Sequence, residues 1–320
     1  IIKDYLISVG MQVDKQSFSQ ADKAIKDVLP DEAVKKALVN KEFDKGKLYV
    51  IAAGKAAWQM AKTASDILGD KIDAGIVITK YGHVKGEIPK MKCYEAGHPV
   101  PDQNSYKATD SAIKLVSHLN KDDIVLFLLS GGGSALFEKP LIEVDELEYI
   151  TKQLLGCGAD IIEINTIRKR LSAVKGGKFA NICKPASIYA IVLSDVLGDR
   201  LDVIASGPAY PDASTSYDAL NIVNKYNLRL SDNALNLLYQ ETPKELDNVE
   251  TIITGSVKNL CQSAMKACEE LGYDPIYLTD QLTCQAKEAG SFLSSIAKSY
   301  QDTKKSLAFV TGGETVVELT

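Results

Sequence analysis

Residues 124–136 read Ile-Val-Leu-Phe-Leu-Leu-Ser-Gly-Gly-Gly-Ser-Ala-Leu. Six consecutive apolar residues followed by a serine, three glycines and small residues predict a buried strand that turns sharply into a helix. A strand that is apolar along its whole length is typical of a parallel sheet with helices on both faces. This stretch therefore predicts a doubly wound, Rossmann-like α/β domain.

Other short segments rich in valine and isoleucine support the same fold, because they alternate with amphipathic helices. The predicted strands comprise residues 48–53, 75–79, 123–129 and 188–193. Residues 1–43 are predicted to be helical, with apolar residues at helical spacing over residues 17–29 and Pro30 as a stop. We assign residues 1–240 to this first domain.

The chain becomes polar over residues 227–248, and Glu241-Thr-Pro-Lys-Glu predicts a linker. Further strand–helix units predict a second, smaller α/β domain over residues 247–320, in keeping with two domains for 320 residues. Its predicted elements are residues 250–254, 258–271, 275–279, 285–300 and 307–310. Because residues 316–319 read as a strand that ends the chain without a turn, we expect this second domain to be incomplete.

The composition excludes several classes of protein. Hydrophobic residues make up 45% and charged residues 25%, which is typical of folded soluble chains. The net charge of -5 argues against a general nucleic-acid binder. The longest apolar run, residues 124–129, is far shorter than the roughly 18 residues of a membrane span, so we expect a cytoplasmic protein without a membrane partner.

The six cysteines form no C-x-x-C pair, and the three histidines lack the spacing of zinc ligands. We therefore expect reduced thiols, and any metal would be bound through oxygen ligands. The sequence leaves the oligomeric state open, including a homo-oligomer.

The glycine loop from Gly131 to Ser134 is the strongest candidate for a binding element. Glycines allow backbone N–H groups to converge on an anion, and the start of a helix adds favourable partial charge. The loop suits a phosphate or a carboxylate, although a purely structural turn is the alternative. It matches neither a Walker loop nor a G-x-G-x-x-G fingerprint.

Lys55 follows Gly54 at the end of another predicted strand. Ligands of open parallel sheets bind at the carboxyl ends of the strands, so Lys55 and the glycine loop are expected to share one site. A lysine there could neutralise charge on phosphoryl oxygens. A solvated surface lysine is the alternative.

Asn165, Arg168 and Ser172 are spaced three or four residues apart, which places them on one face of a predicted helix. That face could present an amide, a guanidinium and a hydroxyl to an anionic substrate. The alternative is an exposed basic helix.

Asp195 and Asp199 follow the predicted strand 188–193. Two carboxylates at this spacing could hold Mg²⁺, or one could accept the proton of a substrate hydroxyl. They could equally cap turns. His98, in the stiff loop Gly97-His-Pro-Val-Pro-Asp, is expected to be structural and is left out of the site.

In their order and spacing, the motifs resemble the glycerate 2-kinase family, whose C-terminal half carries the MOFRL domain. The segments that carry the resemblance are Ala53-Gly-Lys-Ala-Ala, Gly97-His-Pro-Val-Pro-Asp, Ser130-Gly-Gly-Gly-Ser-Ala-Leu, residues 165–177, Ser194-Asp-Val-Leu-Gly-Asp, Ala205-Ser-Gly-Pro and Gly312-Gly-Glu-Thr-Val. They span nearly the whole chain. The resemblance implies ATP-dependent phosphorylation of D-glycerate at its 2-hydroxyl, giving 2-phosphoglycerate, with Mg²⁺ or another divalent cation.

The resemblance also implies that Lys55 is catalytic. In the family its partner is an arginine shortly after the G-G-E-T segment, and this sequence ends at Thr320 before reaching it, so we expect a truncated MOFRL region. We expect Lys55 and Asp195 to be catalytic, with Asp195 and Asp199 as metal ligands. The expected nucleotide- or substrate-binding residues are Gly54, Ser130, Gly131, Gly132, Gly133, Ser134, Asn165 and Arg168.

Two other functions compete with this interpretation. A nicotinamide-dependent hydroxypyruvate reductase should carry a G-x-G-x-x-G turn and an acid about 20 residues later, and the sequence shows neither. A non-catalytic phosphate or phosphosugar binding protein could use the same glycine loop, but would not need Lys55 or the paired acids.

Overall fold

The computed structural model describes residue 26, residues 28–194, residue 198 and residues 200–317. The chain forms two compact units, the larger within residues 34–253 and the smaller mainly from residues 254–317. Asp195, Asp199, most of the predicted N-terminal helical stretch and the end of the predicted strand 316–319 lie outside the described residues.

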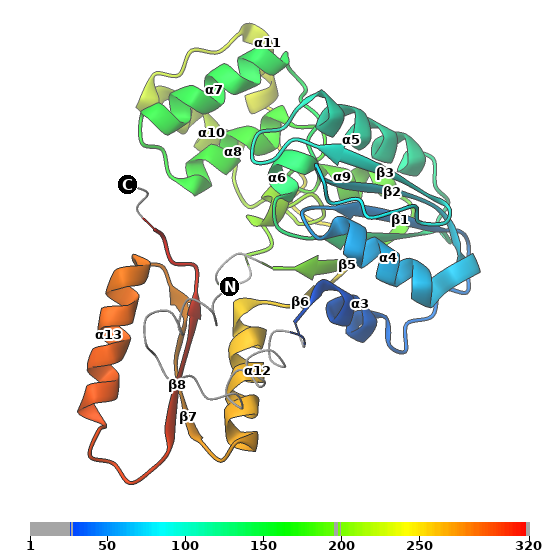
Figure 1. The fold of residues 1–320 in the computed structure, drawn as a ribbon. Coiled ribbons are helices and arrows are strands. Elements are labelled where there is room, and N and C mark those ends of the chain that lie inside the picture. The colour runs from blue at the N-terminus through cyan, green and yellow to red at the C-terminus, as the bar shows by residue number, and fades with distance from the viewer. Residues whose placement is uncertain (1–25, 27, 195–197, 199, 318–320) are drawn as a thin grey trace. The chain divides into compact units, whose positions relative to one another are not determined.

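The larger unit is built on a six-stranded sheet with strand order β3-β2-β1-β4-β5-β6 (Figure 1). The strands are β1 Leu48–Ala53, β2 Ile72–Lys80, β3 Met91–Ala96, β4 Ile124–Leu129, β5 Ser187–Leu193 and β6 Val249–Thr254. Neighbouring strands from β3 to β5 pair in parallel. This order reverses direction between β1 and β4, which is the switch point where ligands of doubly wound folds bind.

Both edges of the sheet differ from the sequence prediction. The edge strand β3 was not predicted, because its sequence Met-Lys-Cys-Tyr-Glu-Ala lacks the apolar run of a central strand. The strand β6 was counted with the second domain, whereas it is the opposite edge of this sheet. Sequence periodicity identifies a strand but does not say which sheet it joins.

The two faces of the sheet carry separate hydrophobic cores. Ile51 and Ala53 belong to the core that includes residues of α5 (Gln103–Val116) and α9 (Lys178–Cys183). Val50 and Ala52 belong to the core that includes residues of α3 (Pro30–Leu38) and α4 (Ala57–Leu68). Alternate residues of one strand are thus buried on opposite faces, which confirms the doubly wound α/β fold.

The helices on the second face are α3 (Pro30–Leu38) and α4 (Ala57–Leu68). Pro30 was predicted to stop a helix, but it is the first residue of α3. Proline is well tolerated at that position because the first N–H groups of a helix have no partner within it. Pro30 therefore begins α3, and the helix that it was predicted to stop lies almost wholly outside the described residues.

Four helices form a third hydrophobic cluster beside the sheet (Figure 1). They are α7 (Val144–Gly156), α8 (Ile161–Leu171), α10 (Ser216–Tyr226) and α11 (Asp232–Leu238). The predicted linker region, residues 227–248, contains α11 and the buried Thr242, whose hydroxyl donates to Asp212 at 2.8 Å. This region is part of the packed unit, because its polar side chains find buried partners.

Short elements complete the larger unit: the single helical turn α6 (Gly133–Leu136) and the 3₁₀ turns η1 (Gly69–Lys71) and η3 (Ile204–Ser206). The smaller unit has a two-stranded parallel sheet of β7 (Asp274–Leu282) and β8 (Leu307–Gly313). Its helices are α12 (Val257–Glu270) and α13 (Ala286–Ser299). Within the described residues, no helix is both long and apolar enough to cross a membrane.

Candidate functional site

The loops that follow β1 and β4 are joined at the switch point. Ala53 lies opposite Leu129 in the register, so the two strands end level with one another. The Lys55 N–H then donates to the Gly131 carbonyl at 2.8 Å, and the Ser130 N–H donates to the Ala53 carbonyl at 3.0 Å. The register therefore brings Lys55 to the glycine loop, as the sequence predicted.

Gly54 and Ser130 form the junction between these loops. Gly54 has a φ of +127°, and a Cβ atom there would lie 2.2 Å from the Ser130 hydroxyl oxygen. Ser130 is buried, and its hydroxyl accepts a hydrogen bond from the Ala56 N–H at 3.0 Å. Both residues were predicted to bind ligand, and the structure gives them this scaffolding contact; their contact with ligand stays a prediction.

Gly132 lies at the centre of the loop, with a φ of +86°. A Cβ atom at this position would lie 2.8 Å from Cδ2 of His98 and 3.1 Å from Cγ of Lys55. The ring of His98 and the stem of Lys55 thus lie against the glycine backbone. Only a residue without a side chain leaves this arrangement undisturbed.

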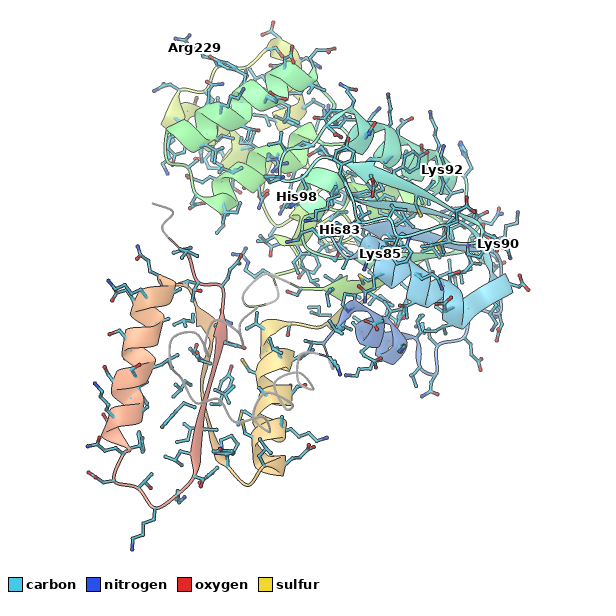
Figure 2. All side chains as sticks on the ribbon, viewed as in Figure 1. His83, Lys85, Lys90, Lys92, His98 and Arg229 are labelled. Carbon is cyan, nitrogen blue, oxygen red and sulfur yellow. The ribbon has the colours of Figure 1, made fainter. Side chains whose placement is uncertain are left out.

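The structure brings His98 to the loop, although the sequence analysis left it out. His98 and His83 lie near α6, at the end of the sheet away from Lys90 (Figure 2). His98 follows the unpredicted strand β3, so its place at the carboxyl edge of the sheet was not visible from the sequence. A prediction of β3 would have made His98 a candidate, since residues just after a parallel strand lie where ligands bind.

The backbone of Lys55 is held by further contacts. Its carbonyl oxygen lies 3.0 Å from Nδ1 of His83 and accepts from the Thr79 hydroxyl at 3.3 Å. The side chain of Lys55 is exposed. A fixed backbone and an exposed ammonium suit a residue that meets an incoming ligand.

Two cations lie beneath the glycine loop and hold the Ser134 carbonyl. Arg168 Nη2 donates to that oxygen at 3.3 Å, and Lys175 Nζ donates to it at 2.9 Å. Both cations also approach the buried Glu138 carboxylate, at 3.5 Å and 3.3 Å respectively. Two cations share one carboxylate, which leaves a local excess of positive charge under the loop.

For attracting an anion, this positive charge is more important than the partial charge at the start of the helix that follows the glycines. That helix, α6, has only four residues. Lys175 is fully buried, and burial lowers its pKa to about 8, opposed by the nearby Glu138 carboxylate. The buried Nε of Arg168 has no hydrogen-bond partner. The positive charge of Arg168 beneath the glycine loop favours an anionic ligand.

Asn165 reaches the loop through a serine that the sequence analysis did not assign to the site. Ser206 donates to Asn165 Oδ1 at 3.0 Å, and its hydroxyl lies 3.5 Å from that of Ser134. Ala205 and Ser206 have φ values of +50° and +60°, an unfavourable conformation for residues other than glycine. Such strain is often found at functional sites, and the Ala205-Ser-Gly-Pro motif was its sequence signal.

Ser172 does not share a helical face with Asn165 and Arg168, contrary to the prediction. Helix α8 ends at Leu171, and Ser172 caps it in an extended conformation. The alternative of an exposed basic helix is also wrong, because Lys169 and Arg170 are buried and pair with Asp212 at 3.1 Å and 3.7 Å. Only Asn165 and Arg168 are directed to the glycine loop.

The proposed metal ligands, Asp195 and Asp199, lie outside the described residues. In the part of the chain that the structure covers, no group of three or more His, Cys, Asp or Glu residues is arranged to hold a metal ion. The assignment of both acids stays a prediction.

The sheet order and the loops at its switch point define the class of doubly wound α/β proteins that bind ligands at the carboxyl edge of the sheet. A family model described as a domain of unknown function, DUF4147, matches residues 18–239. With 51% identity over 303 residues to the D-glycerate 2-kinase of Thermotoga maritima, the chain belongs to the glycerate 2-kinase family.

The match to the Thermotoga relative covers 93% of this chain and 72% of that protein. A glycerate 2-kinase from Pyrococcus horikoshii is 38% identical over 330 residues, covering 97% of this chain and 74% of the relative. The crystal structure of a glycerate kinase from Thermotoga maritima is similar, with a TM-score of 0.91 and 49% identity, and the match covers 96% of this chain and 75% of that one. The resemblance inferred from the motifs is confirmed.

Proposed function

We propose that this protein transfers the terminal phosphoryl group of ATP to the 2-hydroxyl of D-glycerate, forming 2-phosphoglycerate and ADP. The observation that carries the proposal is the meeting of Lys55 and the glycine loop at the switch point, above the half-buried Arg168 and the buried Lys175. The names of the similar Thermotoga and Pyrococcus enzymes support the same reaction.

In the proposed reaction, the 2-hydroxyl oxygen of glycerate forms a bond to the terminal phosphorus as the bond to the ADP oxygen breaks. The hydroxyl proton passes to a base, for which we propose Asp195. Catalysis of such transfers depends mainly on positioning and on neutralising phosphoryl charge. Lys55 neutralises charge on the transferring group, and the N–H groups of the glycine loop orient its oxygens.

Two features of this site fit a polyphosphate. Gly132 lets the stem of Lys55 lie against the loop, since a Cβ atom there would lie 3.1 Å from Cγ of Lys55. Arg168 and Lys175 place positive charge beneath the loop through their bonds to the Ser134 carbonyl. A divalent cation such as Mg²⁺ supplies further neutralisation of phosphate charge, and we propose Asp195 and Asp199 as its ligands.

The test is to incubate the protein with ATP, MgCl₂ and D-glycerate and to record proton-coupled ³¹P spectra of the product. Phosphorylation at the 2-hydroxyl places phosphorus next to one C–H and gives a doublet, whereas the 3-hydroxyl gives a triplet. The proposal requires the doublet. A triplet would reassign the acceptor oxygen, and unchanged glycerate would refute the kinase activity.

A parallel incubation with hydroxypyruvate and NADH separates the reductase alternative. The kinase predicts that NADH absorbance stays constant. Oxidation of NADH would favour a reductase, and ligand binding with no product in either assay would favour a phosphate-binding protein.

A further inference from the structure

A cavity of about 580 Å³ opens in the larger unit. It is lined by residues of α8 and α10 and by segments 200–203 and 212–214. Its volume lies in the range of about 300–1,000 Å³ that is usual for small-molecule sites. A three-carbon acid would fill only a small part of it.

The three cations of this cavity are each paired with one of its four acids. Lys169 pairs with Asp212 at 3.1 Å, Arg200 with Asp202 at 2.7 Å, and Lys225 with Glu163 at 2.6 Å. The remaining carboxylate, Asp218, accepts two hydrogen bonds at 2.7 Å from Thr215, at the start of α10. The described lining therefore offers no unpaired cation for a phosphate. Beneath the glycine loop, in contrast, Arg168 and Lys175 share the single carboxylate of Glu138.

The rest of the lining suits a neutral, partly apolar group. Ile162, Val203 and Ile222 supply aliphatic surface, and Asn165 and Asn221 supply amides that both donate and accept hydrogen bonds. Aliphatic surface with a few amides can hold a flat heterocyclic base and discriminate its edge.

A chain of hydrogen-bonded side chains links the cavity wall to the glycine loop, beginning at Asn165. This residue lines the cavity and also accepts the hydrogen bond of Ser206, whose hydroxyl lies 3.5 Å from that of Ser134. The Ser134 carbonyl is in turn held by Arg168 and Lys175. The wall of a cavity without an unpaired cation is thus linked by hydrogen bonds to a loop with positive charge beneath it.

We propose that this cavity binds the nucleoside of the phosphoryl donor, with the polyphosphate extending to the glycine loop. The inference rests on the proposed function, because it assigns one end of the same donor molecule. A nucleoside triphosphate has an anionic tail and an uncharged, hydroxylated head, and the glycine loop and the cavity match these two parts.

The experiment measures binding of adenosine and of inorganic tripolyphosphate by calorimetry, which requires no turnover. Asn221 and Asn224 are both exposed residues of α10, but only Asn221 lines the cavity. Asn221→Trp should fill the cavity, and Asn224→Trp is its matched control. Ala213→Trp, at a second exposed lining position, checks the result from another segment.

Adenosine should bind the wild type and Asn224→Trp equally, and at least tenfold more weakly to Asn221→Trp and Ala213→Trp. Tripolyphosphate should bind all four proteins alike. Absence of adenosine binding to the wild type, or equal affinity in all variants, would overturn the proposal. If adenosine affinity falls as expected but no 2-phosphoglycerate forms, the cavity assignment stands and the kinase proposal fails.

Discussion

The backbone N–H of Lys55 donates a 2.8 Å hydrogen bond to the carbonyl oxygen of Gly131. This bond joins the end of β1 to the glycine loop after β4, across the switch point of the sheet. It uses only backbone atoms, so the position of residue 55 relative to the loop does not depend on the lysine side chain. The ammonium can therefore be removed without dismantling the junction.

Replacing Lys55 with alanine should lower kcat for glycerate phosphorylation by at least a hundredfold, because the transferring phosphoryl group loses a neutralising cation. The fold should be retained, since the side chain is exposed and the backbone bond remains. Steady-state kinetics and circular dichroism check both parts. Lys121→Ala, at an exposed lysine before β4, is the control, and equal turnover of the two variants would exclude the role of Lys55.

Gly132→Ala should reduce activity tenfold or more, because the new methyl group would lie within about 3 Å of His98 and Lys55. Gly82→Ala is a matched control, with a φ of +76° against +86° for Gly132 and no heavy atom within 4 Å of the added Cβ. Both variants should lose roughly 1 kcal/mol of stability from the left-handed backbone. Denaturant unfolding and kinetics separate the effects, and an equal loss of activity in both would show that backbone strain alone is responsible.

The buried Lys175 should make stability depend on alkaline pH. Burial lowers its pKa to about 8 in the folded protein, so between this pH and the ordinary lysine value the unfolded chain binds more protons. The free energy of unfolding should therefore rise with pH in this window, by about 2 kcal/mol between pH 7 and 9.5 from this group. The rise should be smaller in Lys175→Met, measured by urea unfolding. Parallel pH profiles for the two proteins would rule out this titration.

Asp212 is the central acceptor of a buried network, which makes it a stability determinant. Its carboxylate accepts hydrogen bonds from Lys169, Thr242 and the Ser214 hydroxyl. Burial alone would raise the pKa of Asp212, but Lys169 and the hydrogen bonds outweigh it and hold the pKa below its usual value. The stabilisation is thus present above the usual pKa of aspartate and is lost as the pH falls through the lowered value.

Asp212→Asn should lower the free energy of unfolding by roughly 3–5 kcal/mol near neutral pH, because Lys169 is left buried without its counter-ion. Asp66→Asn, which removes an exposed ion pair with Lys62, should change stability little. Urea unfolding of both variants measures the difference. Similar losses would indicate that the buried network contributes no more than a surface pair.

The apolar runs of β1 and β4 and the glycines after β4 were sufficient to predict the doubly wound fold and the meeting of Lys55 with the loop. Both inferences follow from local information, because a strand buried on both faces must be apolar and its carboxyl end fixes where the next residues emerge. The edge strand β3 has no such pattern and was not predicted. The position of His98, which follows β3 at the carboxyl edge of the sheet, was therefore not predicted either.

The sequence by itself determined the fold class, the family and the residues at the switch point, since these depend on hydrophobic pattern and on the order of motifs. Tertiary structure alone decided that Lys175, Glu138 and Ser206 lie beneath the glycine loop and that Ser172 does not join Asn165 and Arg168. Lys175 and Ser206, beneath the loop, are distant from it in sequence. In the sequence, Lys175 and Glu138 resemble solvated surface charges, and only packing buries them. Long-range packing, which leaves no local periodicity, set the electrostatics of the site.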